Sequence, residues 1–329
     1  MERKVVLKVR NLKQWFPVKT WFFEKKKFVK AVNDVSFDLY EGETLGIAGE
    51  SGCGKSTLIR SCLRLLKPTE GSIEFDGVEI SQMSRSKLRP FRKKMQIVFQ
   101  DPYASLDARW KVRQLLEEPM IINKICATKE ERLEKVMKLM DSVSISREYL
   151  NRYPHEFSGG QRQRIAIASA LTTDPKLVMC DEPVSALDVS VRAQVLNLLK
   201  ELQEEFKLTY IFVSHDMSVI EHICDRVAIM YLGKIVEIGD KDTIFNAPKH
   251  PYTQALLSAV PKADQEADPS KRIILEGDIP SPVDPPAGCV FHTRCKYASE
   301  ICKTAVPETV DLGCGHCVSC HLVSENSEA

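Results

Sequence analysis

One nine-residue segment limits what this chain can fold into more than any other. It fits the phosphate-binding pattern G-x-x-x-x-G-K-[ST] and reads Gly49-Glu50-Ser51-Gly52-Cys53-Gly54-Lys55-Ser56-Thr57. A short buried-type strand, Thr44 to Gly49, leads into it, and apolar residues at helical spacing follow from Ser56 to Leu66. Glycines let the backbone approach an anion, and the N–H groups of the helix start point at it. This context predicts a nucleotide site, with Lys55 between the β- and γ-phosphates and the Ser56 hydroxyl on magnesium.

The rest of the pattern predicts a doubly wound α/β fold with a mainly parallel core sheet and its ligand at the strand ends. Residues 5–10 and 34–40 alternate like strands, and 71–80 is hairpin-like, which predicts an antiparallel β subdomain. From Asp101 to about Phe157 the pattern turns helical, which predicts an inserted helical subdomain at about 101–172. The core is expected to consist of strands 95–100, 177–181 and 209–214, a pair of strands around Gly233, and helices 159–172 and 190–206.

Length and composition indicate one large domain with an appendage. The chain has 329 residues, 43% of them apolar, and single cores stop growing near roughly 250–300 residues. We expect the α/β domain in residues 1–260, a proline-rich linker in 261–288 and a cysteine-rich module in 289–329. The 46 basic and 45 acidic residues nearly cancel, so the global attraction to nucleic acid or anionic lipid is weak. Without a membrane-spanning stretch or a signal-peptide core, a cytosolic location is expected.

Two motifs downstream carry candidate catalytic groups. Asp181 and Glu182 end an apolar strand, where a carboxylate can serve as the general base for an attacking water. The plain alternative is a charged turn, but the phosphate loop upstream favours Glu182 as that base. Ser158-Gly159-Gly160-Gln161 opens a helix, with Ser158 as a natural N-cap. An ordinary capped helix does not call for two glycines, each of which weakens it by roughly 1 kcal/mol, so a phosphate contact is favoured.

Together these motifs resemble the nucleotide-binding subunit of an ATP-binding-cassette (ABC) transporter, whose cofactors are ATP and Mg²⁺. The resemblance implies that Asp181 makes the outer magnesium contact. It implies that Gln100 senses magnesium and the attacking water, and links to the transmembrane partner. His215 would contact the γ-phosphate and hold the water and Glu182 in place, although a lone histidine after a strand is usually a packed or surface residue.

The same resemblance implies a shared site. In this family the Ser158–Gln161 element meets the γ-phosphate of ATP held by the opposite subunit, so two chains form a head-to-tail dimer around two nucleotides. Asp188 would help to set that dimer interface. The family also stacks an aromatic residue on adenine. Phe28 lies nearest the expected offset, while Trp21-Phe22-Phe23 precedes it in a long segment and leaves the choice open.

Three strings look like the ATPases of oligopeptide and dipeptide importers: Asp101-Pro102-Tyr103-Ala104-Ser105-Leu106-Asp107, Arg152-Tyr153-Pro154-His155-Glu156-Phe157 and His250-Pro251-Tyr252-Thr253-Gln254-Ala255-Leu256-Leu257. The implied partners are a second, related ATPase, two transmembrane permease subunits and an extracytoplasmic peptide-binding protein, with this chain on the cytoplasmic face of the membrane. Nickel importers share much of the pattern, so a nickel or other solute stays an alternative. A soluble cassette acting on nucleic acid or the ribosome is disfavoured, because residues 281–321 hold three basic against four acidic side chains.

Six of the eleven cysteines gather after residue 288, with His292, His316 and His321 among them. Cytosolic cysteine clusters usually ligate metal, which predicts a metal centre that staples a small tail. The family resemblance favours a [4Fe–4S] cluster on Cys289, Cys295, Cys302 and Cys320. Cys314 and Cys317 depart from that pattern and leave a Zn²⁺ site open. The scattered cysteines are expected in the core, and Cys53 in the phosphate loop is expected to be alkylated easily.

Overall fold

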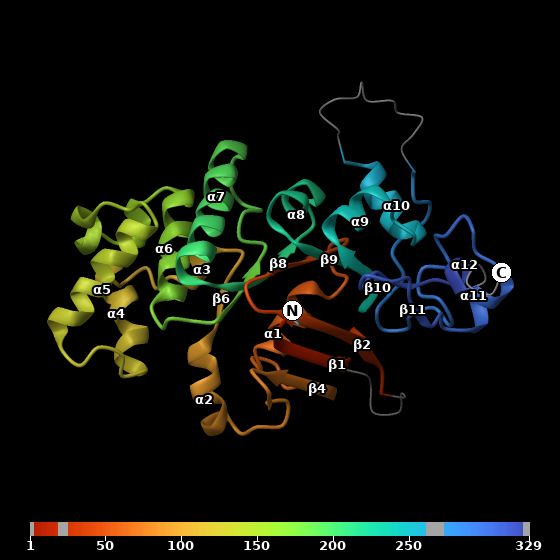
Figure 1. The fold of residues 1–329 in the computed structure, drawn as a ribbon, viewed down its shortest axis with the longest axis horizontal. Helices are drawn as coiled ribbons and strands as arrows, with labels where there is room; N and C mark the ends of the chain where they lie inside the picture. The colour runs from red at the N-terminus through yellow and green to blue at the C-terminus, as the bar shows by residue number, and fades with distance from the viewer. Residues whose placement is uncertain (1–2, 19–25, 261–272, 325–329) are drawn as a thin grey trace. The chain divides into compact units, whose positions relative to one another are not determined.

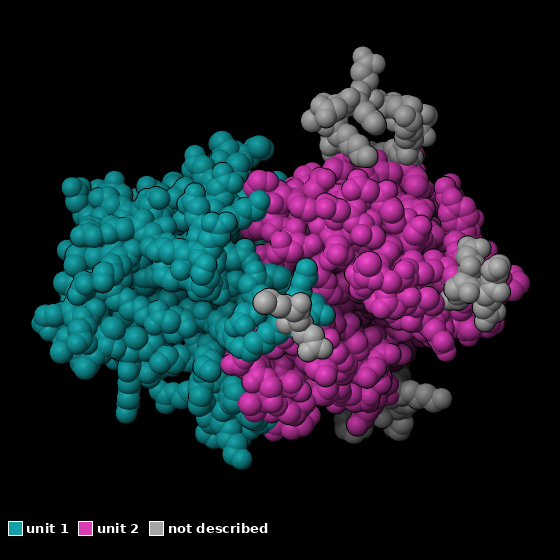
Figure 2. Space-filling view, viewed as in Figure 1, with its two compact units in different colours: residues 1–4, 40–43, 83–213 teal, residues 5–39, 44–82, 214–329 magenta. Residues whose placement is uncertain are grey.

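In a computed structural model of the chain, residues 3–18, 26–260 and 273–324 are described, and they fall into two units (Figure 2). Unit 1 comprises residues up to Lys4, 40–43 and 83–213, and unit 2 comprises 5–39, 44–82 and the described residues from 214 onward. The Trp21-Phe22-Phe23 segment and residues 261–272 of the expected linker lie outside the described residues.

Unit 1 contains a parallel sheet formed by β6 (Met95–Val98), β7 (Leu177–Asp181) and β8 (Thr209–Ser214). Every residue of the central strand β7 is buried, as expected for an apolar run in a parallel sheet. Val98 pairs with Cys180, and Asp181 pairs with Val213. The carboxyl ends of β6 and β7 therefore lie side by side, where α/β sheets place their functional side chains.

The helical stretch predicted from Asp101 to Phe157 is confirmed as a series of short helices in unit 1. The helices α4, α5 and α6 pack against one another (Figure 1). At the start of α5, Thr128 Oγ1 accepts the N–H of Glu131 (3.1 Å) while the Glu131 carboxylate accepts the N–H of Thr128 (3.3 Å), a capping box. The helical segments of unit 1 are α2 (Arg85–Lys94), α3 (Pro102–Ser105), α4 (Val112–Ile122), α5 (Lys129–Ser142), η1 (Arg147–Asn151), η2 (Pro154–Glu156), α6 (Gly159–Leu171) and α7 (Val189–Phe206).

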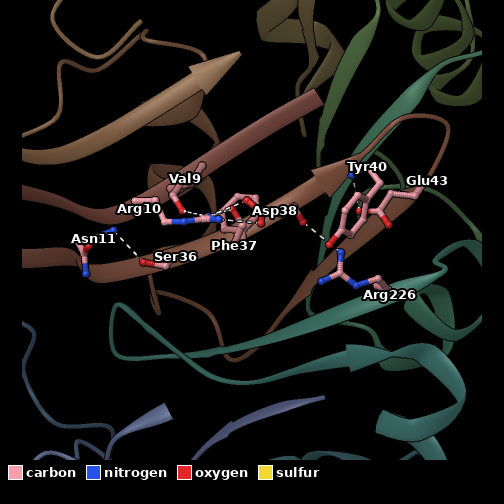
Figure 3. Close-up of polar contacts among 9 residues, drawn as sticks. All are labelled: Val9, Arg10, Asn11, Ser36, Phe37, Asp38, Tyr40, Glu43 and Arg226. Carbon is pink, nitrogen blue, oxygen red and sulfur yellow. Dashed lines mark hydrogen bonds and ion pairs between the residues drawn. The ribbon is translucent and has the colours of Figure 1, made fainter. Parts of the chain in front are cut away.

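The predicted antiparallel β subdomain is present in unit 2. It is a sheet of order β2-β1-β4-β5, built from β1 (Val5–Pro17), β2 (Phe28–Tyr40), β4 (Glu70–Phe75) and β5 (Val78–Glu79). Figure 3 shows how polar side chains tie its strands together. Arg10 on β1 donates to the Asp38 carboxylate (2.7 Å) and to the Phe37 carbonyl (3.1 Å) on β2. Arg226, at the start of another strand of unit 2, donates to the carbonyl of Asp38 (3.1 Å) and attaches this sheet to that strand.

The second sheet of unit 2 is mixed. Its strand β3 (Thr44–Ala48) lies parallel to β9 (Arg226–Tyr231), but β10 (Lys234–Asp240) returns antiparallel to β9. The turn between β9 and β10 has positive φ at Leu232 (44°) and Gly233 (79°), a two-residue connection that reverses the chain. The closing pair of strands expected around Gly233 is therefore confirmed, and it is antiparallel because short turns can only join antiparallel neighbours.

The cysteine-rich tail continues this mixed sheet. Its strand β12 (Cys317–Ser319) pairs antiparallel with β10, and β11 (Thr309–Asp311) pairs with β12. The N–H of Lys30 in β2 donates to the carbonyl of Pro282 (2.9 Å), so part of the expected linker is also bonded to unit 2. The helices of this unit are α1 (Lys55–Cys62), α8 (Met217–Ile223), α9 (Lys241–Asn246), α10 (Pro251–Ser258), α11 (Glu300–Thr304) and α12 (His321–Ser324). None of the helices in the described part of the chain has the length and apolar character that a membrane span requires.

His250 links the stability of unit 2 to pH. Its Nδ1 accepts the N–H of Tyr252 (3.1 Å) at the start of α10, the residue is 1% exposed, and burial lowers its pKa to about 3. An unfolded histidine has a pKa of about 6.5. Between these values only the unfolded chain binds the proton, so stability falls as the pH falls from 6.5 towards 3, by at most about 1.4 kcal/mol per pH unit.

We expect His250→Asn, which keeps a capping acceptor but cannot titrate, to flatten this pH dependence. Urea unfolding of both proteins at pH 7, 6 and 5 measures it. Equal slopes in the two proteins would mean that His250 does not set the acid sensitivity.

Candidate nucleotide-binding and catalytic residues

The phosphate loop lies where the sequence predicts it, between β3 and α1 of unit 2. All five residues of β3 are buried, and α1 begins at Lys55. The Lys55 side chain folds back over the loop, and its Nζ donates to the carbonyls of Gly49 (2.8 Å) and Glu50 (3.0 Å). The residue is only 5% exposed, so a full positive charge is held inside the turn of the loop. An anion bound there would meet this charge together with the helix start.

Gly54 shows why the loop needs glycine. Its φ of 106° is strained for any other residue, and a Cβ atom there would lie 2.0 Å from the carbonyl oxygen of Ala31. Gly54 is the N-cap of α1 and brings no capping side chain. The backbone N–H groups of the helix start are therefore offered to a ligand rather than to a serine or aspartate.

Glu50 is fixed by two residues that the sequence analysis did not connect to the loop. The hydroxyl of Tyr252 accepts the N–H of Glu50 (2.9 Å). The Arg294 guanidinium donates to both carboxylate oxygens of Glu50 (2.8 and 3.1 Å), across 244 residues of sequence. No local pattern could reveal either contact, because both depend on how the tail folds back onto the loop.

Cys53 is a buried residue of the phosphate loop. The residue is 6% exposed, and burial raises the pKa of its thiol. Thiolate is the reactive form of cysteine. Both observations disfavour easy alkylation in this conformation, and the burial confirms the expectation that Cys53 is a core residue.

In unit 1 the ends of β6 and β7 bring the candidate catalytic residues together. Gln100 Nε2 donates to the Glu182 carboxylate (3.1 Å) and to Ser185 Oγ (3.3 Å), and Ser185 Oγ donates to the carbonyl of Glu182 (3.1 Å). Asp181 is 1% exposed at the end of β7, whereas Glu182 is partly exposed. The two carboxylates thus occupy different environments, one buried at the strand end and one reachable from solvent.

Glu182 has a φ of 49°, which is uncommon for a residue with a side chain. Its N–H donates to the carbonyl of Val213 on β8 (3.1 Å), which holds the backbone in this conformation. Strained residues of this kind gather at functional sites when the surroundings hold them in place. Here the turn directs the carboxylate towards Gln100 instead of along the strand.

The glycine-rich helix start is also in unit 1. Ser158 Oγ accepts the N–H of Gln161 (3.3 Å), and Gln161 Oε1 accepts the N–H of Ser158 (3.1 Å), which confirms Ser158 as the N-cap of α6. Gly160 has a packing reason that the sequence did not show. A Cβ atom there would lie 2.3 Å from Val191 Cγ1 on α7, whereas one on Gly159 would meet only Leu187 Cδ2 at 3.7 Å.

The other predicted site residues are placed as follows. His215 is exposed and follows β8, and Asp188 is the exposed N-cap residue of α7. Phe28 is at the start of β2, where its ring centroid lies 6.4 Å from that of Trp15. Trp15 also has the ammonium groups of Lys13 and Lys30 within 5.6 Å of its ring centroid. The structure therefore places Trp15 beside Phe28, the residue expected to stack on adenine.

The six tail cysteines separate into two groups. Burial, together with the charges of Cys289, Cys295 and Cys302, raises the pKa of Cys320 to about 11, so these four thiols share one electrostatic neighbourhood. The Cys317 thiol is influenced instead by Asp311 and Arg226, and Cys314 is exposed. The histidines are already engaged: His292 with the Cys289 carbonyl (2.8 Å), His316 with Glu237 (2.8 Å) and His321 with the Ala305 carbonyl (3.0 Å).

The described residues contain no group of three or more histidine, cysteine or acidic side chains arranged to hold a metal ion. The expected metal-binding tail is thus not supported by the arrangement of these side chains. A cluster of several irons and sulfides occupies more space between its cysteine ligands than a single ion does. The chemistry of the four neighbouring thiols fits such a group, since they are thiol ligands and no histidine of the tail competes with them.

Comparison with known families and relatives agrees with this geometry. Residues 32–185 match the family model described as "ABC transporter", and residues 236–302 match "Oligopeptide/dipeptide transporter, C-terminal region". The chain is 54% identical over 325 residues to the oligopeptide transport ATP-binding protein AppF of Bacillus subtilis, with 98% of each chain covered. The chain belongs to the ABC transporter ATP-binding proteins. Within them it falls in the oligopeptide/dipeptide branch.

Other relatives of this ABC protein give the same picture. It is 50% identical over 321 residues to the dipeptide transport ATP-binding protein DppF of Escherichia coli, covering 98% of this chain and 95% of the relative. Among solved structures it is similar to the ATP-binding cassette MJ0796, a dimer in a post-hydrolysis state with ADP and Pi. That match has a TM-score of 0.64 and 28% identity over 71% of this chain and 98% of the other. The cassette fold is thereby confirmed.

The packing of α6 against α7 can be tested with alanine substitutions. We expect Gly160→Ala to lower the free energy of unfolding by about 1–3 kcal/mol, the cost of overpacking against Val191. Gly159→Ala is the matched control and should be neutral or stabilising. Adding Val191→Ala to Gly160→Ala should restore part of the loss in chemical denaturation, and equal losses for the two glycine variants would contradict the assignment.

Proposed function

We propose that this chain is the ATP-hydrolysing subunit that powers import of oligopeptides or dipeptides through a membrane ABC transporter. The observation that carries the proposal is the match to a peptide transport ATP-binding protein over 98% of both chains. The matched length includes residues 236–302, which fit the family model of the oligopeptide/dipeptide transporter C-terminal region. The peptide itself is bound by other subunits, so this chain contributes the ATP cycle.

In this cycle each predicted residue has a role that follows from its chemistry. Lys55 and the amides of residues 49–57 hold the phosphates, and Ser56 and Asp181 hold magnesium. Glu182 is the general base for the attacking water, oriented by Gln100, whose amide lies 3.1 Å from the carboxylate. His215 contacts the γ-phosphate, and Phe28 stacks on adenine.

The catalytic unit is a head-to-tail dimer of ATPase subunits. The Ser158–Gln161 helix start of one subunit completes the phosphate site of the other, and Asp188 helps to set the interface. A similar cassette, solved as a dimer with ADP and Pi, supports this arrangement. We infer that the second ATPase is a related but distinct chain. Two permease subunits and an extracytoplasmic peptide-binding protein complete the transporter and hold this chain at the cytoplasmic face of the membrane.

The tail of the chain would hold a [4Fe–4S] cluster on Cys289, Cys295, Cys302 and Cys320. What supports this ligand set is their shared electrostatic neighbourhood, from which Cys314 and Cys317 are separate. The cluster supplies thiolate–iron bonds that staple a small segment, a structural contribution that such tails need. The alternative is a four-coordinate Zn²⁺ site that uses Cys314 or Cys317 with the earlier cysteines.

Glu182→Gln tests the catalytic proposal. Because an amide cannot accept the proton of water, we expect ATP turnover in the assembled transporter to fall by about 10²- to 10⁴-fold while MgATP binding is kept. Glu201→Gln changes an exposed glutamate on α7 and should leave turnover unchanged. Unchanged transport and turnover with Glu182→Gln would remove the proposed role of this residue.

The same variant tests the heterodimer. We expect the purified Glu182→Gln chain with ATP to stay largely monomeric at micromolar concentration and to dimerise with a second ATPase that copurifies from native membranes. A tight homodimer, with no second ATPase in the native complex, would show that the chain pairs with itself.

Metal analysis tests the tail. Anaerobically purified full-length protein should show iron–sulfur absorption in the visible range, with iron and acid-labile sulfide. Cys289→Ser should lower both contents, and the exposed Cys314→Ser should leave them unchanged. Zinc without sulfide would favour the alternative, and a metal-free native protein would end the proposal.

A further inference from the structure

The phosphate loop is held by three separate contacts to one of its residues. The carbonyl of Glu50 accepts a hydrogen bond from Lys55 Nζ (3.0 Å), and its N–H donates to the Tyr252 hydroxyl (2.9 Å). Its carboxylate accepts two hydrogen bonds from the Arg294 guanidinium (2.8 and 3.1 Å). Lys55 belongs to the loop itself. The other two contacts come from the C-terminal part of unit 2, so the order of the loop depends on residues more than 200 positions away.

Arg294 is well placed to act as a fixed support. Its side chain is 7% exposed, and it lies between Cys289 and Cys295 in the tail. Phe291, three residues earlier, is 1% exposed and packs edge-on against Tyr231 (ring centroids 5.2 Å apart, 85° between planes) and near Tyr252 (5.3 Å). The Arg294 guanidinium itself lies 6.0 Å from the Tyr231 ring centroid. This aromatic cluster anchors the tail segment beside the loop.

The charge of Glu50 gives the contact a consequence for ligand binding. A carboxylate in a phosphate-binding loop repels a polyanionic ligand, and the repulsion is strong where water is partly excluded. The Glu50 side chain is only 26% exposed. A bidentate arginine both neutralises a carboxylate and fixes its direction, which a lysine cannot do equally well. Arg294 therefore offsets the negative charge of Glu50 at the place where nucleotide phosphates would bind.

We propose that Arg294 is a positioning residue through which the cysteine-rich tail holds Glu50, and with it the phosphate loop, in the form that receives ATP. Arg294 acts through Glu50 and does not itself touch the nucleotide. The inference rests on the proposed function for its ligand, ATP. It goes further by making the tail a determinant of nucleotide affinity in the same chain, in addition to any structural role of its cysteines.

The test is a double-mutant cycle in the full-length chain with MgATP as the probe. We expect Arg294→Gln to weaken ATP binding roughly tenfold, within the usual range of coupling between sites. In a Glu50→Gln background the same change should matter less than about threefold, since no carboxylate is left to neutralise. The loss in the single variant should shrink as salt is raised, because the repulsion is screened. A mere folding defect would be neither rescued by Glu50→Gln nor reduced by salt.

Lys303→Gln is the matched control. It removes an exposed ion pair with Glu300 in the same tail, away from the loop, and should leave ATP affinity unchanged. If Arg294→Gln does not fold, Arg294→Lys replaces it and should show a smaller loss in the same direction. An effect of Arg294→Gln equal to that of Lys303→Gln, or equal in both Glu50 backgrounds, overturns the proposal.

Hydrogen exchange without nucleotide separates this inference from the proposed function. We expect the amides of residues 50–54 to exchange faster in Arg294→Gln than in the wild type or Lys303→Gln, because the loop has lost a support. Unchanged exchange overturns the positioning role whatever the ligand is. Failure of the wild type to bind ATP, with exchange behaving as expected, would instead overturn the proposed function and leave the loop support standing.

Discussion

The close approach of backbone to backbone at the phosphate loop is the constraint on which the rest of the structure depends. A Cβ atom on Gly54 would lie 2.0 Å from the carbonyl oxygen of Ala31 on β2. Lys55 Nζ donates hydrogen bonds to the carbonyls of Gly49 and Glu50. Such a loop keeps its shape only if the strands beneath it are fixed. The antiparallel sheet, the β9–β10 turn and the tail all contribute, since the N–H of Gly233 also donates to the carbonyl of Cys53 (2.9 Å).

The catalytic side chains of unit 1 follow from a simpler rule. Parallel strands end at the same edge, so β6 and β7 bring Gln100 and Glu182 within hydrogen-bond distance although 82 residues separate them. The positive φ of Glu182 then turns its carboxylate away from the strand. Strand direction and one strained residue thus bring Gln100 and Glu182 together.

What the sequence predicted well was local in the chain. The strand, loop and helix around Lys55, the capped start of α6 and the strands β6 and β7 all depend on patterns of a few residues. What it missed depends on contacts between distant segments: Arg294 on Glu50, and the packing of Gly160 against Val191. The strands that the tail adds to this sheet were missed for the same reason, because the paired residues of β10 and β12 lie 79 and 81 positions apart, beyond any periodicity. Helix α8 was also missed, because it is short and its only start signal, the N-cap Asp216, comes directly after a strong strand pattern.

The pairing of β12 with β10 gives the tail a second physical meaning. Without β12 and β11, the backbone groups along one side of β10 would form an open sheet edge, which is a template for pairing with other chains. Glu237, wholly buried on β10, would also lose His316, one of the groups that solvate its carboxylate. The short hairpin that replaces this edge ends in exposed polar residues, Thr309 and Asp311. Truncating the chain before residue 309 therefore does more than remove an appendage. It exposes the edge of β10 to pairing with other chains and removes the histidine partner of the buried Glu237 carboxylate.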